Sequence, residues 1–366
     1  MAKVLHIYKT YMPFTMGGVE QVIQQLAIST AAEGHTHQVL TLHEGSSVEV
    51  IHRPEAEVTG VPWHLHIQST PLSIDYIKRF RVMASKVDII HYHHPFPLQD
   101  IAQLFSKSDK PSVVTYHSDV IRQKWANKVY SPLLNHFLGA VNVVVASSEQ
   151  YRQSSTVLQA HRDKTQVIPF GLAEDSYPGL SSSLENSNLQ DVWRKKFPEG
   201  FFLFVGVLRY YKGLNVLIEA AKKTGLPVVI AGDGPIRKTV EQAADEIKNV
   251  HYLGMVSETD KMALLRVATA FAFPSAQRSE AFGISLLEAA MFGKALISAE
   301  IGTGTSFINQ HNETGIVIPA NDASALANAM NTLWHDESLR QVMGEAARAR
   351  FLEKFTASEM GQKYAQ

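Results

Sequence analysis

The chain of 366 residues lacks cysteine and carries almost no net charge, with 34 basic and 35 acidic residues. The absence of cysteine excludes disulfide bonds, thiolate metal ligands and a cysteine nucleophile, and it is typical of a reducing, cytoplasmic compartment. The balanced charge provides no basic field for nucleic acid, so no nucleic-acid partner is expected. No run approaches the ~20 apolar residues of a membrane-spanning helix. Residues 2–8 form too short an apolar run for a signal peptide and predict a buried strand instead.

What the sequence does contain is a regular alternation of strand patterns and helical patterns. The first half predicts strands over residues 4–8, 38–42, 89–91, 112–116, 141–147 and 165–168, and the second half over 201–205, 227–231, 250–252, 270–273, 295–298 and 315–318. The alternation indicates parallel sheets with crossover helices, and the length favours two domains. The predicted fold class is α/β, with two doubly wound, Rossmann-like domains facing each other across a cleft. The polar stretch 172–196 is interpreted as their linker.

Two glutamates, Glu280 and Glu288, flank a predicted helix start. Residues 284–292 have helical periodicity, and Gly283 lies just ahead of them, where the backbone can open. A helix start offers unpaired N–H groups and the positive end of the helix dipole, which favour a phosphate or diphosphate. Carboxylates accept hydrogen bonds from hydroxyl groups, so the stretch indicates a site for a sugar linked to phosphate. The alternative is two solvated glutamates beside an ordinary buried helix.

Further polar motifs follow other predicted strands. Gly17 and Gly18 separate the first strand from a helix and allow close approach of a ligand, although their spacing is not the dinucleotide fingerprint. His117 follows the strand at 112–116, where ligands of doubly wound sheets bind. Arg209 and Lys212 follow the first strand of the second half, where two cations would neutralise a diphosphate. A tight turn and solvated loop cations are the alternatives.

Histidines at positions 91, 93 and 94 also end a strand and raise the possibility of a metal site. The chain has no cysteine, no D-x-D pattern and no H-E-x-x-H pattern to accompany them. Hydrogen-bonding histidines are therefore expected, and no metal is predicted.

Taken together and in this order, these residues resemble the retaining, nucleotide-sugar-dependent glycosyltransferases of family 4, which have the GT-B fold. The family's pattern is an E-x7-E pair, a Gly-Gly loop, a strand-end histidine, an Arg/Lys pair before a glycine, and G-x-G-P, present here at 232–235. The resemblance covers nearly the whole chain. It implies a metal-independent transferase with no cofactor besides its nucleotide-sugar donor. It also implies an acceptor-binding domain of residues 1–171 plus 353–366 and a donor-binding domain of residues 197–352.

The resemblance assigns a role to each motif. It implies that two cations bind the donor diphosphate, that Glu280 holds hydroxyls of the transferred sugar, and that Glu288 holds the ribose. His117 would lie close to the transferred sugar. The implied catalytic residues are His117, Arg209, Lys212 and Glu280, and the implied donor-binding residues are Gly17, Gly18, Arg209, Lys212, Glu280, Phe282, Gly283, Ile284 and Glu288. The family's arginine usually follows the strand-end glycine directly, but Val207 stands there, and Arg209 is expected to substitute from two residues on.

Residues 8–11, 209–213 and 301–306 look more specifically like bacterial mannosyltransferases of O-antigen assembly. That resemblance implies GDP-mannose as donor and a polyprenyl-diphosphate-linked saccharide as acceptor, at the cytoplasmic face of the inner membrane. A transferase that uses GDP-rhamnose or a UDP-sugar would share the phosphate-binding residues. Two different functions also fit the fold: a nucleotide-sugar epimerase, and an inactive homologue that only binds its ligand.

A lipid-linked acceptor requires a surface that faces the membrane, and two stretches are candidates. Residues 121–130, continuing to Phe137, and residues 76–82 mix basic side chains with aromatic and aliphatic ones, as interfacial helices do. The alternative for each is an ordinary amphipathic helix whose apolar face packs on a sheet.

Overall fold

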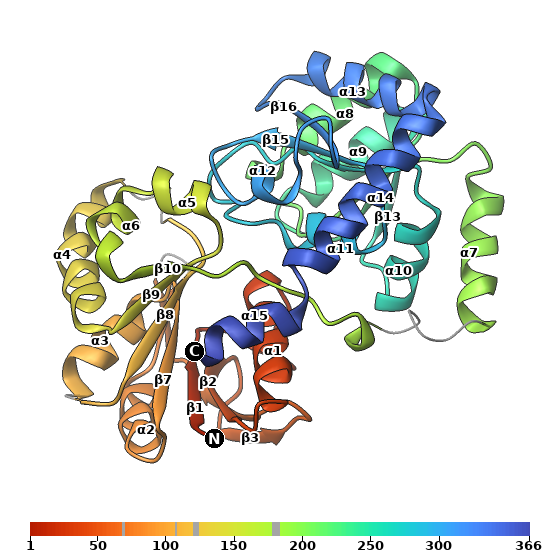
Figure 1. Cartoon of the computed structure of the whole chain (residues 1–366). Coiled ribbons are helices and arrows are strands. Elements are labelled where there is room, and N and C mark those ends of the chain that lie inside the picture. The colour runs from red at the N-terminus through yellow and green to blue at the C-terminus, as the bar shows by residue number, and fades with distance from the viewer. Residues whose placement is uncertain (68–69, 107, 120–123, 178–183) are drawn as a thin grey trace. The chain divides into compact units, whose positions relative to one another are not determined.

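The structure is a computed structural model that describes residues 1–366 except 68–69, 107, 120–123 and 178–183 (Figure 1). The described residues form two compact units: residues 1–171 together with 357–366, and residues 172–356. Each unit is a Rossmann-like α/β domain built on one mainly parallel sheet. The central strands of the second unit are short runs of Val, Ile, Leu, Phe and Ala, which suit strands that helices cover on both faces.

The sheet of the first unit has eight strands in the order β10-β9-β8-β7-β1-β2-β4-β3. Neighbouring strands pair in parallel, except β3, which is antiparallel to β4. The strands are β1 (Lys3–Ile7), β2 (Thr36–His43), β3 (Glu49–His52), β4 (Glu57–Pro62), β7 (Ile89–His94), β8 (Ser112–Tyr116), β9 (Val143–Ala146) and β10 (Thr165–Val167). A separate hairpin consists of β5 (Leu65–Ile67) and β6 (Thr70–Leu72).

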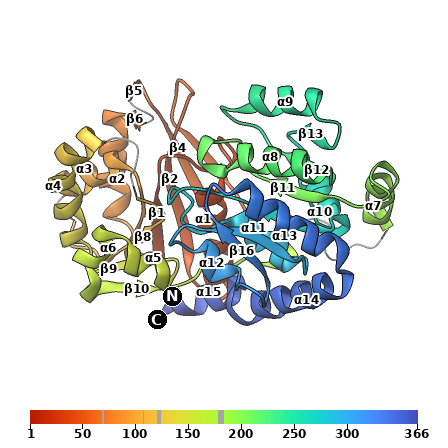
Figure 2. The same cartoon turned by 90° about the horizontal axis from the view of Figure 1, so that it is seen from above.

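Helices cover both faces of this sheet. Figure 2 shows α2, α3 and α4 on one side and α1 and α15 on the other. The helices are α1 (Gly18–Ala31), α2 (Ile74–Ala84), α3 (Pro97–Ser106), α4 (Lys124–Ala140), α5 (Glu149–Ser154), α6 (Thr156–Ala160) and α15 (Ala357–Ala365). Because α15 packs against α1, the last residues of the chain belong to the first unit.

The first sheet is larger than the sequence predicts. The six expected strands are present, but β3 and β4 extend the sheet beyond β2, and the hairpin β5–β6 was not expected either. Strand β3 is a four-residue edge strand with no buried side chain, and β4 contains Gly60 and Pro62. Short exposed edge strands and strands with glycine or proline give weak sequence signals, which explains the difference.

The second unit has a six-stranded parallel sheet in the order β13-β12-β11-β14-β15-β16. Its strands are β11 (Phe202–Val205), β12 (Val228–Ala231), β13 (Val250–Gly254), β14 (Ala270–Phe273), β15 (Leu296–Glu300) and β16 (Gly315–Pro319), matching the six predicted strands. This is the 3-2-1-4-5-6 order of a doubly wound sheet, whose ligands bind outside the strand ends where the order reverses. The reversal lies between β11 and β14.

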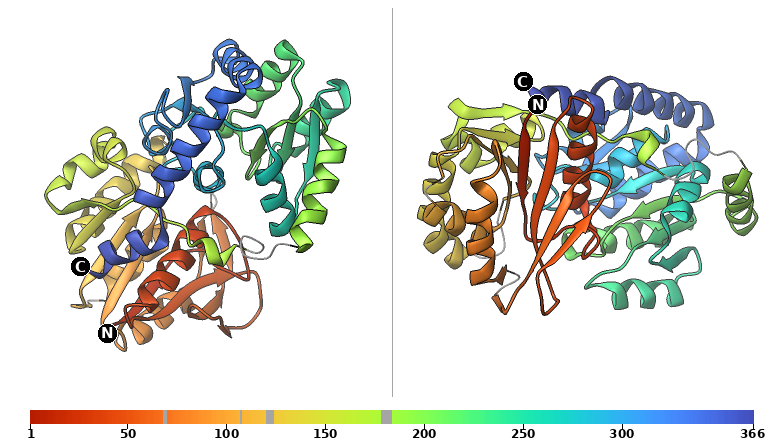
Figure 3. Two further views of the ribbon diagram at one scale, coloured as in Figure 1. Left: turned by 45° about the vertical axis from the view of Figure 1, so that its right-hand side comes forward. Right: turned by 90° about the horizontal axis from the view of Figure 1, so that it is seen from below.

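The helices of the second unit are α7 (Leu184–Lys196), α8 (Leu214–Thr224), α9 (Arg237–Glu246), α10 (Glu258–Val267), α11 (Ile284–Met291), α12 (Thr305–Ile308), α13 (Ala323–His335) and α14 (Glu337–Lys354). Figure 3 shows the chain passing from α14 into α15, the blue helices that lead to the C-terminus. The segment 172–196, interpreted from the sequence as a linker, contributes α7, which packs on α10 within the second unit. The polar composition of α7 concealed this helix.

Two stretches, residues 121–130 and 76–82, were proposed to face a membrane, and the structure describes the side chains of only the second in full. Of residues 121–130, positions 121–123 and the side chains up to 129 lie outside the described residues. Helix α2 contains the other stretch, and it buries Tyr76 and Phe80 completely while Lys78, Arg79 and Val82 stay exposed. The aromatic face of α2 therefore packs inside the unit. Among the described residues, no helix is long and apolar enough to cross a bilayer.

Candidate functional site

The switch point of the second sheet brings a lysine and a glutamate together. Lys212 lies in the loop after β11, and Glu280 in the loop after β14, so the two neighbouring strands deliver them to the same edge. Their side chains form a buried ion pair. Ser275 donates a hydrogen bond to Glu280 Oε2 at 3.2 Å, and Lys212 Nζ lies 4.9 Å from the centre of the Phe273 ring. A cation and a carboxylate are thus held at the place where a doubly wound sheet binds its ligand.

Helix α11 begins directly beside this pair. Gly283 precedes the helix with φ of 99°, a left-handed conformation that favours glycine, and it supplies no capping side chain. The first hydrogen bond within the helix runs from Leu287 N to Gly283 O at 3.0 Å. The amides of Ile284, Ser285 and Leu286 therefore have no partner within the helix, and the positive end of its dipole is available to an anion.

The loop at residues 302–305 fastens the segment before α11. Thr303 Oγ1 donates to the carbonyl of Glu280 at 2.7 Å, and Gly304 N donates to the carbonyl of Ala281 at 2.8 Å. A side chain on Gly304 would lie 2.5 Å from the Phe282 ring, so only glycine allows this contact. Ser275 was not singled out from the sequence, and Thr303 appeared only as part of the stretch 301–306, because their partners are 5 and 23 residues away.

Glu288 has a lysine partner that sequence reasoning missed. Its side chain is buried on α11 and accepts a hydrogen bond from Lys261 Nζ of α10 at 3.0 Å, and Lys261 also bonds Glu258 at 2.8 Å. Burial opposes the charged form of Lys261, but the attraction of the two carboxylates outweighs it, so the pKa of Lys261 is raised. The Glu288 side chain is therefore held in place by a buried cation.

Arg209 differs from Lys212 although the two share a loop. Arg209 is exposed, and within the described part of the chain its side chain forms no hydrogen bond or ion pair. Val207, which occupies the family's arginine position, is 43% exposed. The structure therefore leaves the Arg209 guanidinium uncommitted, which agrees with a ligand-binding role.

The G-x-G-P motif explains how the loops after β11 and β12 fit together. Gly206 N donates to Ala231 O, and Leu208 N donates to Asp233 O at 2.9 Å. A Cβ atom on Gly232 would lie 2.0 Å from the carbonyl oxygen of Gly206. These glycines are therefore needed for close packing of two backbones, and they hold the loop that carries Lys212.

The Gly-Gly loop of the first unit leads into α1. Gly17 is the N-terminal cap residue and Gly18 the first residue of the helix. The buried carboxylate of Glu20 lies beside this helix start, because a Cβ atom on Gly17 would be 2.8 Å from Glu20 Oε2. A phosphate near Gly17 and Gly18 would therefore meet a negative charge unless Glu20 turned away.

His117 stands directly after β8, at the strand end where the sequence places it. It is buried, and its ring lies 5.2 Å from that of Phe170. Burial, together with His91 and His94, lowers the pKa of His117 to about 3, so the imidazole is neutral at pH 7. A neutral imidazole accepts a hydrogen bond at one nitrogen and donates one at the other.

His117 belongs to a cluster of buried histidines in the first unit. Among the described residues, His6, His91 and His93 offer nitrogen atoms within 4.8 Å of one another, a spacing at which a metal ion can bind. Both nitrogens of His6 and of His93 are, however, within hydrogen-bonding distance of other histidines, and His91 Nε2 lies 2.7 Å from Thr115 Oγ1. Hydrogen bonds account for this spacing as well, so the expectation of a metal-free site remains a prediction.

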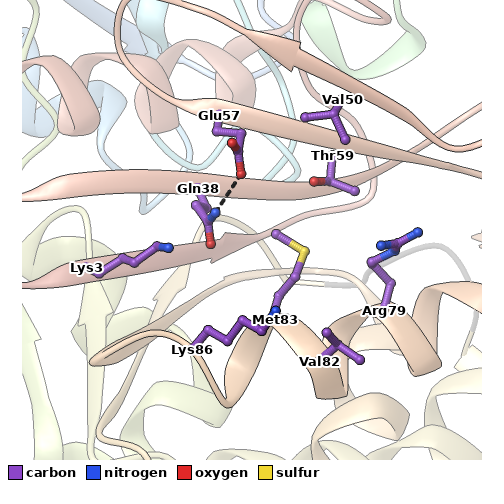
Figure 4. Close-up of a pocket in the computed structure, with 9 residues that line it drawn as sticks. All are labelled: Lys3, Gln38, Val50, Glu57, Thr59, Arg79, Val82, Met83 and Lys86. Carbon is purple, nitrogen blue, oxygen red and sulfur yellow. Dashed lines mark hydrogen bonds between the residues drawn. The ribbon is translucent and has the colours of Figure 1, made fainter.

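A pocket of about 200 Å³ opens elsewhere on the first unit, between the sheet and α2 (Figure 4). Its lining includes Lys3, Arg79, Lys86 and Glu57. The Glu57 carboxylate accepts a hydrogen bond from Gln38 at 2.6 Å. Lys3 is the first residue of β1 and Glu57 the first of β4. The pocket therefore lies toward the amino ends of the strands, away from the edge at which ligands of such sheets bind.

Comparison with known proteins decides the family. Residues 16–175 match the family described as Glycosyltransferase Family 4, and residues 186–350 match Glycosyl transferases group 1. A D-rhamnosyltransferase, WbpZ, of Pseudomonas aeruginosa is 46% identical over 97% of this chain and 92% of its own length. The chain belongs to the glycosyltransferases, with a family 4 match in its first half and a group 1 match in its second half.

A second relative of this glycosyltransferase, the O-antigen chain mannosyltransferase C of Escherichia coli, is 45% identical over 99% of the chain and 96% of the relative. Solved structures with the same GT-B fold include a sucrose-phosphate synthase from Thermosynechococcus elongatus, with a TM-score of 0.79, 20% identity, and coverage of 100% and 99% of the two chains. Another is Anabaena HepE in complex with UDP-glucose, with a TM-score of 0.77, 18% identity, and coverage of 100% and 98%. The predicted α/β fold class with two Rossmann-like domains, and the membership of the glycosyltransferases, are thus confirmed.

Proposed function

We propose that this glycosyltransferase transfers mannose from GDP-mannose to a polyprenyl-diphosphate-linked saccharide during O-antigen synthesis. The observation that carries the proposal is the buried Lys212–Glu280 pair beside the start of α11. A cation and a helix start suit the diphosphate of the donor, and a carboxylate suits the hydroxyls of the sugar. The choice of mannose and of an O-antigen acceptor follows the 45% identical mannosyltransferase.

In this proposal Lys212 neutralises the leaving diphosphate, and Arg209 turns from solvent to bind it as well. The amides of Phe282, Gly283 and Ile284 approach the phosphates at the helix start. Gly17 and Gly18 are also proposed to bind the donor, which requires the Glu20 carboxylate to turn away, and His117 is proposed to lie close to the transferred sugar. Glu280 holds the sugar, whereas Glu288, steadied by Lys261, accepts hydrogen bonds from the ribose.

The proposed chemistry retains the configuration of the sugar and needs no metal ion. As the bond from the sugar to the diphosphate breaks, positive charge develops on the sugar, and the hydroxyl of the acceptor attacks from the same face. The hydroxyl proton passes to the leaving phosphate. Lys212 and the dipole of α11 stabilise the charge that accumulates on that phosphate. No protein nucleophile is assigned, because Glu280 is committed to Lys212 and Ser275.

A second candidate donor is GDP-rhamnose, favoured by the 46% identical D-rhamnosyltransferase. The decisive experiment supplies a lipid-diphosphate-linked sugar with GDP-mannose, GDP-rhamnose or UDP-glucose in separate reactions and identifies the product by mass spectrometry. Transfer of rhamnose alone would overturn the mannosyl assignment and leave the transferase assignment intact. Thermal-shift measurements with GDP, UDP and ADP identify the base independently, since a ligand that binds the native state raises Tm. Stabilisation by UDP and not by GDP would exclude both guanosine donors.

The epimerase alternative has its own test. An epimerase would convert a nucleotide sugar without any acceptor, so GDP-mannose is incubated with the protein alone and the sugar is analysed by chromatography. We expect an unchanged sugar, and a new epimer would overturn the transferase proposal. An inactive binding homologue would bind GDP and transfer nothing with any donor.

A lipid-linked acceptor also requires contact with the cytoplasmic face of the inner membrane, which we propose as part of this function. On α2 the exposed residues Lys78, Arg79 and Arg81 accompany Ile74 and Val82, which are 74% and 50% exposed. Changing the three cations to serine should reduce flotation with anionic liposomes, because each basic residue contributes ~1 kcal/mol near such a surface. The matched control is Lys222→Ser and Lys223→Ser on the exposed face of α8. Equal flotation of all variants would remove α2 as the contact.

A further inference from the structure

Four buried histidines form a continuous row across the sheet of the first unit. His37 Nδ1 lies 3.1 Å from His6 Nε2, His6 Nδ1 lies 3.2 Å from His93 Nε2, and His93 Nδ1 lies 3.0 Å from His117 Nε2. The row begins at Thr30 of α1, whose Oγ1 lies 3.0 Å from His37 Nε2. We call the set Thr30, His37, His6, His93 and His117 the histidine chain.

The register of the sheet explains the row. His37, His6 and His93 belong to the neighbouring strands β2, β1 and β7, and His117 directly follows β8. His6 pairs with Val39, two residues after His37, and with His91, two residues before His93. His93 pairs with Thr115, two residues before His117. Because a step of two residues keeps a side chain on the same face, the histidines climb diagonally to the carboxyl ends of the strands.

Thr30 determines which ring nitrogen carries the hydrogen atom in each histidine of the row. Its hydroxyl donates to the carbonyl of Leu26 at 2.7 Å, so its single hydrogen is used there. Thr30 Oγ1 must then accept a hydrogen bond from Nε2–H of His37, which leaves His37 Nδ1 as an acceptor. A neutral imidazole carries one hydrogen, so the same assignment passes along the row: His6, His93 and His117 each donate through Nε2–H and accept at Nδ1.

Burial keeps the row neutral, as this assignment requires. It lowers the pKa of His37 to about 4 and that of His117 to about 3, and it lowers the pKa of His6 and His93 well below the usual value. The row therefore ends at His117 with a lone pair on Nδ1, and this nitrogen makes no hydrogen bond within the described residues.

We propose that Thr30, His37, His6 and His93 are positioning residues that hold His117 in its Nε2–H tautomer, so that Nδ1 accepts a hydrogen bond from a hydroxyl of the sugar substrate. This inference rests on the proposed function, in which His117 lies close to the transferred sugar. It also states a specificity: the site accepts an O–H donor and disfavours a phosphate or carbonyl oxygen, because two lone pairs would face each other. Thr30 would thus influence the reaction through three intervening side chains.

Nuclear magnetic resonance of protein labelled with ¹⁵N-histidine tests the tautomer directly. Long-range ¹H–¹⁵N correlations distinguish the two neutral tautomers and the cation, and the signals of His117 are identified by their loss in His117→Gln. We expect the Nε2–H tautomer for His37, His6, His93 and His117 at pH 7. The Nδ1–H tautomer or an imidazolium at His117 would overturn the proposal.

Thr30→Val removes the acceptor at the start of the row while conserving its shape. We expect both tautomers of His117 in this variant and a loss of about tenfold in kcat/KM for sugar transfer, the equivalent of one hydrogen bond. Thr30→Ser restores the hydroxyl and should restore both readouts. An unchanged tautomer in Thr30→Val would contradict the proposal, and so would a changed tautomer with unchanged transfer.

His91→Leu is the matched control. His91 is buried on the same strand as His93, and the two rings stack at 4.3 Å, but His91 bonds Thr115 and stands outside the row. We expect lower stability with the His117 tautomer preserved. Stoichiometric zinc bound by the purified protein, with loss of the Nε2–H signals of His6 and His93 on zinc addition, would show a metal site and overturn the proposal. Failure of the wild-type protein to transfer sugar would refute the proposed function while the tautomer assignment stands.

Discussion

At the scale of single residues, the candidate site contains a buried ion pair, Lys212 with Glu280. Lys212 and Glu280 are each 9% exposed, and no element between β11 and β14 separates them in the sheet. A buried charge that loses its partner lowers the stability of a protein several times more than an exposed charge does. Each member of the pair is therefore tied to the stability of the second unit as well as to the proposed binding of the donor.

Lys212→Met should lower the free energy of unfolding by about 3 kcal/mol, because it leaves the Glu280 carboxylate buried without a partner. It should also lower kcat for transfer by about 100-fold or more through loss of a cation at the diphosphate. Urea denaturation and initial-rate kinetics measure the two effects. The control Lys222→Met, at an exposed lysine of α8, should change stability by less than about 0.5 kcal/mol. Equal behaviour of both variants would contradict the buried pair.

At the scale of elements, the start of α11 depends on a left-handed glycine. A Cβ atom on Gly283 would lie 3.0 Å from the ring of Phe273, and φ there is 99°. Both the backbone conformation and the contact disfavour any other residue. The sequence predicts this helix start correctly because the glycine directly precedes the periodic run.

Gly283→Ala should lower stability by about 2 kcal/mol and weaken GDP binding, since the helix start would shift away from the ring. Gly225 provides the control, because it also has positive φ, 71°, but nothing lies within 4 Å of a Cβ atom there. Gly225→Ala should cost only about 1 kcal/mol, with GDP binding intact. Thermal denaturation and calorimetric titration with GDP compare them. If both variants bind GDP like the wild type, the α11 start is not the phosphate site.

A buried carboxylate on α3 should make the first unit sensitive to pH. Burial raises the pKa of Asp100 to about 8, although the hydrogen bond from the Tyr130 hydroxyl opposes this shift. The unfolded carboxyl group has a pKa near 3.8, so the folded state binds more protons between about pH 4 and pH 8. The free energy of unfolding should therefore fall as pH rises through this window, by up to about 1.4 kcal/mol per pH unit.

Asp100→Asn removes the titrating group, so its unfolding free energy should depend less steeply on pH between 4 and 8. Guanidinium denaturation at several pH values measures the slopes. Asp88, an exposed aspartate of the same unit, gives the control variant Asp88→Asn, which should retain the wild-type slope. Identical slopes for Asp100→Asn and the wild type would show that Asp100 ionises normally.

At the scale of the whole molecule, the chain leaves the first unit at residue 171 and returns to it with α15. Helix α15 lies beside α1 in Figures 1 and 2, and Tyr364 bonds Thr115 at 2.8 Å, next to His91. The last residues of the sequence thus complete the packing around the first strands.

Gly361→Val should detach α15 from α1, because a Cβ atom there would lie 2.7 Å from Ser29 Oγ and 3.2 Å from the Ser29 carbonyl carbon. Overpacking of this kind costs about 1–3 kcal/mol. Chemical denaturation measures the loss, and proteolysis should cut the variant near its C-terminus. Gln362→Val, at an exposed position of the same helix, should behave like the wild type. Wild-type stability of Gly361→Val would show that α15 does not depend on this close contact.

The strands of the second unit and the start of α11 could be predicted because their signals are local. Buried parallel strands are continuous apolar runs, and Gly283 stands directly before a periodic segment. The edge strand β3 and helix α7 could not be predicted in this way, since β3 is a strand of only four residues with no buried side chain and the sequence of α7 is polar. The role of each site residue stays a prediction.

The fold class and the two doubly wound sheets follow from the amino-acid sequence alone, because the alternation of strand and helix patterns indicates them. The resemblance of its motifs to those of known glycosyltransferases implies the family. Which side chains meet depends on the tertiary structure. Lys261 with Glu288, Thr303 with the Glu280 carbonyl, and the histidine chain join residues from separate helices, loops and strands. The register of parallel strands sets the contacts of the histidine chain, and the packing of helices and loops on the sheet sets the other two. Both depend on the whole sheet rather than on any one segment.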